Sequence, residues 1–239
     1  CINTTDPSVT TILTGQYPTR HGVLNHGVNV TEEEMNYAAG TTPVAELLGG
    51  SLRTIGVDTL ERWHSRGFDK YYNPNSEEQS GVLNALAAVR DRLPTKLANL
   101  SKNLYSKFFV DGFVLGNSDQ MTNAAIESMQ ESKEPFFTFV HYWDPHIPYE
   151  DQDDRPKAIR ARTYEDDRNI GTLLNDIKGS YWGNELRNGL LGDVQTVGDI
   201  KRNYDTGVVK ADQQVGRVVD YLKREGVYED TAIIVTADH

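Results

Sequence analysis

Three short apolar runs constrain the fold of this chain more than any other feature of its sequence. They span residues 53–58, 136–142 and 231–237, and each is rich in Val, Ile, Phe or Thr without a clean alternation of apolar and polar residues. Apolar side chains at consecutive positions are typical of strands that are covered on both faces, as in parallel sheets. The runs therefore predict three buried strands of a largely parallel sheet.

Helical patterns alternate with these strands. Apolar residues recur at spacings of three and four between Val208 and Leu222, which predicts a helix over about 206–225. Gly226 follows at the position that a C′ glycine takes after a helix. A second helical pattern covers residues 124–131. Helix, short loop and apolar strand in this order indicate a layered α/β fold.

The chain has 239 residues, enough for one large α/β domain. We expect a single domain over residues 1–239, with excursions from the sheet at about 76–118 and 150–203. The first residue is Cys1, and His239 follows directly on a predicted strand. We therefore expect an internal fragment of a longer protein, incomplete at both ends. Both a cytoplasmic and an exported location stay open.

Composition narrows the classes of partner. The formal net charge is −11, from 24 basic and 35 acidic residues, which argues against nonspecific binding of nucleic acid. One cysteine allows no intrachain disulfide. No run approaches the roughly 20 apolar residues that span a bilayer, but association with a membrane stays open. An anionic substrate would need locally placed positive charge, most economically a metal ion.

Two places combine chemically useful residues with useful positions. Asp6 suits an N-cap and Pro7 a first helical position, which predicts that Thr5 lies just outside a helix N-terminus, where anions bind. Asp238 and His239 follow a predicted parallel strand, at the edge where ligands gather and where such a pair can bind a divalent cation. An ordinary capped helix and a surface Asp-His pair are the competing interpretations.

The segment after Thr5 resembles the signature of the sulfatase family, within the alkaline phosphatase superfamily. The signature reads nucleophile-x-Pro-Ser-Arg, then Leu-Thr-Gly, Tyr-Pro and His-Gly. The matching residues are Pro7-Ser8, Leu13-Thr14-Gly15, Tyr17-Pro18 and His21-Gly22. The resemblance implies a three-layer α/β/α sandwich with a largely parallel central sheet. It puts Thr5 at the nucleophile position and Val9 at the arginine position.

Further motifs resemble those of the same family. There, the residues at Asp238 and His239 bind the catalytic metal together with the nucleophile, so the resemblance implies a divalent cation (Ca, Mg, Mn or Zn) held by Thr5, Asp238 and His239. His146 lies after an apolar strand, in a segment that resembles the family's His/Asp-x-His-x-Pro, and would contact the sulfate or phosphate group or protonate the leaving oxygen. Arg62 and His64 would contact the transferred oxyanion, although a surface Arg beside a packing Trp stays open. The motif at His21 is interpreted as packing near the site.

The resemblance implies a metal-dependent hydrolase of sulfate or phosphate esters, in which the threonine forms a covalent intermediate. Formylglycine is not expected, because oxidised threonine is a ketone and the supporting arginine is replaced by Val9. The substrate would be a small-molecule, glycan or lipid ester. The alternatives are an enzyme similar to phosphodiesterases or phosphoglycerol transferases, and a non-catalytic relative that binds anions. A segment before Cys1 would supply acidic metal ligands.

Overall fold

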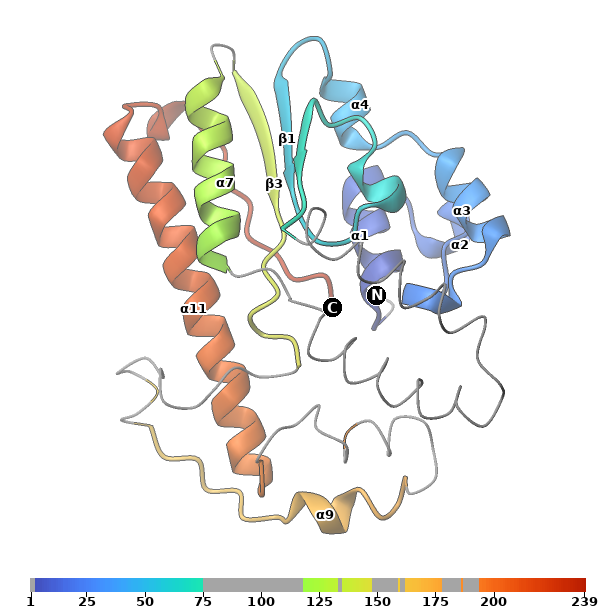
Figure 1. Cartoon of the computed structure of the whole chain (residues 1–239), viewed down its shortest axis with the longest axis vertical. Coiled ribbons are helices and arrows are strands. Elements are labelled where there is room, and N and C mark those ends of the chain that lie inside the picture. Colours follow the sequence, from blue (N-terminus) through green and yellow to red (C-terminus); the bar gives the residue numbers. More distant parts are fainter. Residues whose placement is uncertain are drawn as a thin grey trace, which may run out of the picture. The chain divides into compact units, whose positions relative to one another are not determined.

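The computed structural model describes residues 3–74, 118–132, 135–147, 159, 162–177, 186 and 194–239 of the chain. Figure 1 shows the elements of these residues. The helices are α1 (Thr5–Thr14), α2 (Pro18–His21), η1 (Gly27–Asn29), α3 (Glu32–Ala39), α4 (Val44–Leu48), η2 (Arg62–Ser65), α7 (Ser118–Glu131), α9 (Ile170–Leu173), α11 (Val197–Arg224) and η5 (Tyr228–Asp230). The strands are β1 (Arg53–Val57), β2 (Lys70–Tyr72) and β3 (Phe136–Val140).

The chain folds into two compact units. The first comprises Cys1–Pro74, Gln120–His141 and Val218–His239, and the second comprises Asn75–Asp119 and Tyr142–Arg217. The excursions predicted at 76–118 and 150–203 fall inside the second unit, and much of them lies outside the described residues. No helix in the described part of the chain is long and apolar enough to cross a membrane.

A parallel sheet in the order β2-β1-β3 forms the framework of the first unit. Arg53 pairs with Phe136 and Val57 with Val140, so β1 and β3 run together over their full lengths. Helix α7 and the group α1 to α4 flank the strands on opposite sides in the view of Figure 1. Residues 54–57 of β1 are all buried, as expected for a strand covered on both faces. The predicted α/β fold with a parallel sheet is confirmed.

The predicted strand 231–237 is not formed. Residues after Thr231 are extended but pair with no strand among those that the structure describes. Ile234 is 87% exposed and Val235 is 72% exposed. An apolar run becomes a strand only where a neighbouring strand accepts its N–H and C=O groups, and composition alone does not report such a neighbour.

Asp69 fastens the start of β1 to the loop before β2. Its carboxylate accepts the N–H of Thr54 at 2.8 Å and the Thr54 hydroxyl at 3.0 Å, and the Asp69 N–H donates to the same hydroxyl at 2.9 Å. The Thr54 hydroxyl is also 3.0 Å from the Gly67 carbonyl. These bonds close the loop that carries η2, and they therefore fix the position of Arg62 and His64.

Glu34 locks α3 to the segment that follows α2. Its carboxylate accepts the N–H groups of Leu24, Asn25 and Thr31 at 2.7–2.8 Å. The Thr31 hydroxyl accepts the Glu34 N–H, which completes a capping box. Burial by itself raises the pKa of Glu34, but the hydrogen bonds from Thr31, Asn25 and Leu24 outweigh it and lower the pKa from 4.5 to about 2.

This carboxylate makes the fold acid-sensitive over a defined range. Because the folded pKa lies below the unfolded value, the stabilisation is present above pH 4.5 and is lost as the pH falls toward 2. We expect Glu34→Gln to lower the free energy of unfolding at neutral pH by up to about 3 kcal/mol. Urea unfolding across that pH range measures it, with the exposed Glu32→Gln as the matched control. Equal losses in both variants would contradict the assignment.

Candidate functional site

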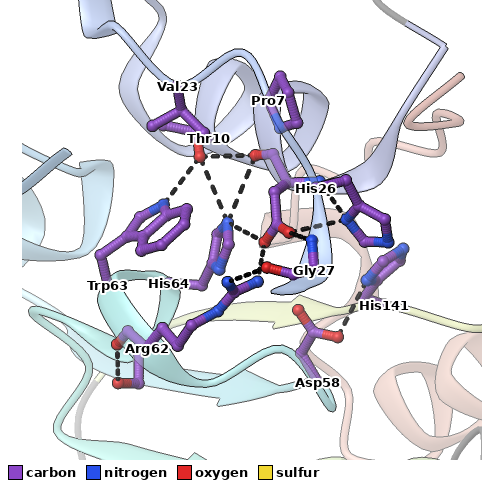
Figure 2. A network of polar contacts seen from close by, with 12 residues as sticks. Pro7, Thr10, Val23, His26, Gly27, Asp58, Arg62, Trp63, His64 and His141 are labelled. Carbon is purple, nitrogen blue, oxygen red and sulfur yellow. Dashed lines mark hydrogen bonds and ion pairs between the residues drawn. The ribbon is translucent and has the colours of Figure 1, made fainter. Parts of the chain in front are cut away.

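Asp6 lies at the centre of a buried polar network in the first turn of α1 (Figure 2). Its Oδ2 is 2.7 Å from His26 Nδ1 and accepts the Gly27 N–H at 2.7 Å, while Oδ1 forms an ion pair with Arg62. The Asp6 side chain is fully buried, whereas that of Arg62 is 31% exposed. Burial by itself raises the pKa of Asp6, but His26, Gly27 and Arg62 lower it to about 2. Asp6 is therefore a carboxylate at neutral pH.

The role predicted for Asp6 is wrong. Helix α1 begins at Thr5, so the N-cap is Thr4, whose side chain caps nothing, and Asp6 lies inside the first turn. The local sequence suited a cap, but the carboxylate instead takes partners that are 20 to 56 positions away. Gly15 ends the helix with a positive φ of 66°, which glycine adopts without strain.

Thr10 joins the same network from the next turn of α1. Its hydroxyl donates to the Asp6 carbonyl at 2.6 Å, accepts the Trp63 indole N–H at 2.9 Å and lies 3.3 Å from His64 Nε2. The His64 side chain is buried, and its Nδ1 has no hydrogen-bond partner among the described residues. Burial lowers the pKa of His64 to about 4 against the opposing charges of Asp6 and Asp58. His64 is therefore neutral at pH 7.

A second pair stands at the carboxyl ends of β1 and β3. Asp58, which directly follows β1, is fully buried and its Oδ1 lies 2.9 Å from Nδ1 of His141, which follows β3. Burial by itself lowers the pKa of His141, but the hydrogen bond and charge of Asp58, with the charge of Asp238, raise it. Asp58 acts electrostatically on His64 as well. It thus connects the two histidines at one edge of the sheet.

Sequence reasoning missed the roles of Asp6, Asp58 and His26. For Asp58 a signal was present, because an acidic residue at the carboxyl end of a buried parallel strand stands where ligands gather. For Asp6 and His26 there was none, since their contact depends on the turn between α2 and α3. The packing role predicted for His21 is confirmed. Its buried ring accepts the Val23 N–H at 3.1 Å and lies 3.1 Å from the Thr11 hydroxyl.

Thr5 is the first residue of α1 and is 3% exposed. In Figure 1 the start of α1 and the end of the chain lie below the sheet, toward the carboxyl ends of the strands. There, His239 donates its N–H to Asp238 Oδ1 at 3.0 Å, and its Nε2 lies 3.6 Å from Asp238 Oδ2. The structure thus brings the start of α1 and the Asp238–His239 pair to the same end of the first unit.

His146 belongs to the second unit. Its side chain is exposed, its Nδ1 contacts the Ile147 carbonyl, and its ring meets the edge of Trp143 at 5.4 Å between centroids. In the same unit the Ser118 hydroxyl donates to Asp144 at 2.7 Å. An exposed imidazole beside an aromatic ring keeps the proton-transfer chemistry that the sequence suggested, and the role of His146 stays a prediction.

A family model described as Sulfatase matches residues 1–239. The chain belongs to the sulfatase family. The chain is 24% identical over 265 residues to the uncharacterized sulfatase YdeN of Escherichia coli (strain K12), which covers 98% of the chain and 38% of YdeN. It is 27% identical over 119 residues to the multifunctional alkaline phosphatase superfamily protein PehA of Trinickia caryophylli, which covers 44% of the chain and 23% of PehA. No solved structure is significantly similar.

The sulfatase therefore spans well under half the length of these relatives. Its membership confirms the resemblance found in the signature after Thr5. The family is one of hydrolases whose substrates are in general sulfate esters. Its members generally use a divalent metal ion.

The described residues fit a metal ion only in part. A carboxylate and an imidazole stand side by side in Asp238 and His239, and both are ligands of divalent cations. Within the part of the chain that the structure describes, however, no group of three or more His, Cys, Asp or Glu side chains gathers around one point. The pair supplies suitable donors but not a complete ligand set.

Proposed function

We propose that this sulfatase is a hydrolase of sulfate or phosphate esters in which the Thr5 hydroxyl is the nucleophile. The observation that carries the proposal is the position of Thr5 in the first turn of α1, anchored there by the buried network of its neighbour Asp6. A helix N-terminus offers free N–H groups and the positive end of the dipole to an anion. A hydroxyl held there is aimed at the group that the helix binds.

The proposed reaction has two steps. The Thr5 hydroxyl passes its proton to a solvent water while its oxygen forms a bond to sulfur or phosphorus, and the bond to the ester oxygen breaks. The leaving alcohol carries away a proton, for which the exposed His146 is our candidate donor. Water then displaces the threonine oxygen, which releases sulfate or phosphate and restores the hydroxyl.

Positive charge near Thr5 comes from Arg62. Its guanidinium is partly exposed and stacks over Trp63 at 4.7 Å, so it is held in place yet reachable by a ligand. Its role is to bind the oxygens of the transferred group as their charge develops. His64 was expected to bind the same oxygens, but its burial favours a role in supporting Asp6 and Thr10.

Asp238, His239 and Thr5 are the residues that we assign to a divalent cation. Such an ion lowers the pKa of a hydroxyl bound to it, which would activate the threonine. The assignment rests on the donor chemistry of the Asp238–His239 pair and on the motif in which it stands. The other ligands and the identity of the ion are not assigned.

The identities of Val9 and Thr5 bear on whether the substrate is a sulfate ester or a phosphodiester. Val9 is fully buried at the position where the signature carries arginine, so no guanidinium from that position supports a formylglycine. Direct attack by threonine is compatible with a phosphodiester as well as with a sulfate ester. Phosphodiesterase and phosphoglycerol-transferase activity is therefore the second candidate function.

Paired assays test the proposal. The full-length protein, supplied with Ca²⁺, Mg²⁺, Mn²⁺ or Zn²⁺ in turn, is given 4-nitrophenyl sulfate and bis(4-nitrophenyl) phosphate. Turnover of either ester that disappears in Thr5→Ala supports it, and the preferred ester decides between the two candidates. If neither ester is cleaved with any of these ions, the hydrolase proposal falls and a non-catalytic, anion-binding relative takes its place.

The metal assignment predicts a change in binding that needs no turnover. Losing even an outer-shell partner of a metal costs about 10- to 100-fold in affinity, so we expect Asp238→Asn to weaken Mn²⁺ binding by at least about tenfold. Isothermal titration of the full-length protein measures the affinity. Asp220→Asn, at an exposed aspartate on α11, serves as the control. Unchanged affinity in Asp238→Asn would remove this residue from the ligand set.

A further inference from the structure

Asp6, the residue after the proposed nucleophile, forms an ion pair with Arg62. Arg62 was expected to present its full charge to an anionic ligand, but its guanidinium contacts the carboxylate of a fully buried aspartate. That aspartate is the immediate neighbour of Thr5 in the chain. The positive charge beside Thr5 is therefore compensated before any ligand arrives.

The carboxylate is held so that it stays beside Arg62. Oδ2 is engaged by His26 at 2.7 Å and by the Gly27 N–H at 2.7 Å, which leaves Oδ1 directed at the guanidinium. Arg62 is held in turn, because its Nη1 donates to the Gly27 carbonyl at 3.2 Å and its plane stacks on Trp63. Figure 2 labels His26, Gly27 and Arg62, the three partners of this carboxylate.

This compensation is local to the Arg62 guanidinium and is separate from the charge of the cation assigned to Thr5. Asp58 adds a second buried carboxylate whose charge reaches His64, and His64 itself is neutral at pH 7. Buried charges act on one another more strongly than charges in water. Each additional negative charge on a ligand is therefore opposed more strongly here than beside an uncompensated arginine.

We propose that Asp6 is a specificity-determining, positioning residue. By holding Arg62 and compensating its charge, it makes the site favour esters whose transferred group carries one negative charge over those that carry two. The favoured class includes sulfate monoesters and phosphodiesters, and the disfavoured class includes phosphate monoesters. This inference rests on the proposed function and adds its selectivity for charge.

Asp6→Asn tests the inference because it removes the charge while nearly preserving the shape. Full-length protein with its metal ion is assayed at about pH 8, where a phosphate monoester is a dianion. The substrates are 4-nitrophenyl sulfate, bis(4-nitrophenyl) phosphate and 4-nitrophenyl phosphate. We expect the ratio of kcat/KM for the better singly charged ester to that for the monoester to fall by about tenfold. The singly charged ester that the wild-type protein cleaves with the higher kcat/KM shows whether its substrates are sulfate monoesters or phosphodiesters.

The controls separate charge from structure. Glu46→Gln removes the carboxylate of another arginine pair, 2.7 Å from Arg66, and is expected to leave the ratio unchanged. Arg62→Gln is expected to shift the ratio in the opposite direction, and Asp6→Asn added to it is expected to bring the ratio back toward the wild-type value, because the double variant has the net charge of the wild-type pair. Thermal unfolding of each variant checks that it is folded.

Each outcome decides one claim. If Asp6→Asn lowers kcat/KM for all three esters equally, or if Arg62→Gln leaves the ratio unchanged, Asp6 only supports the fold and the inference is overturned. The proposed function survives either result. If Thr5→Ala retains full turnover, the proposed function itself fails, whatever the ratio does.

Discussion

Thr5→Ala is expected to lower kcat by at least about 10³-fold, because removal of a covalent nucleophile leaves only binding and charge stabilisation in the site. The free energy of unfolding should change little, because alanine has a high helix propensity. The contacts that anchor α1 are made by Asp6 and Thr10. Thermal unfolding monitored beside the assay separates the two effects.

Two further variants sharpen this result. Thr4→Ala is the matched control, because the Thr4 hydroxyl is buried without a hydrogen-bond partner among the described residues. It is expected to keep turnover within about threefold of wild type, because the lost hydroxyl makes no hydrogen bond to a described residue. Thr5→Ser keeps a hydroxyl and should retain measurable activity. Mass spectrometry of a rapidly quenched reaction should find the sulfo or phosphoryl group on Thr5. Its presence on another residue would contradict the assignment.

Gly67→Ala is expected to cause one of the largest losses of stability in the first unit, about 3 kcal/mol or more. Gly67 has a φ of +85°, where residues with a Cβ are strained, and it lies against α4. An added Cβ would stand 2.6 Å from the backbone nitrogen of Glu46. Backbone cannot move aside as a side-chain tip can. Urea unfolding measures the loss in the free energy of unfolding. The midpoint temperature of thermal unfolding should fall by about 6–12 °C.

Gly50→Ala isolates the steric part of this effect. Gly50 has nearly the same φ, +82°, but an added Cβ would meet nothing within 4 Å. We expect Gly50→Ala to cost only the conformational strain, about 1–2 kcal/mol. Equal losses in the two variants would show that close packing of Gly67 on α4 contributes nothing. Because Gly67 lies in the loop that carries η2, partly folded Gly67→Ala should also lose activity.

The sequence predicted the elements that carry a strong local signal. Strands β1 and β3 were found because their apolar residues are consecutive, and α11 because its stripe repeats over several turns. The helix begins earlier than predicted, at Val197, since its first turns are polar and contribute nothing to that stripe. Strand β2 was missed because three residues with a lysine carry no apolar run.

The site was predictable only where a motif fixed it. Thr5, Arg62, Asp238 and His239 were predicted as site residues from motifs that resemble those of the family, yet the contacts that hold Arg62 were not predicted. Asp6 satisfied every local rule for a helix cap, and three contacts from distant parts of the chain redirected it. Such contacts depend on the packing of α1 against η2, which no window of the sequence contains.

The fluorescence of Trp63 can report on the binding of a ligand at this network. Its indole lies 4.7 Å from the Arg62 guanidinium on one side and 4.7 Å from the His64 ring on the other, and its N–H is fixed on Thr10. Indole emission responds to nearby charge. Binding of an anion to Arg62, or protonation of His64, would therefore change the emission of Trp63, one of three tryptophans in the chain. Ligand entry can thus be timed optically, without a chromogenic ester.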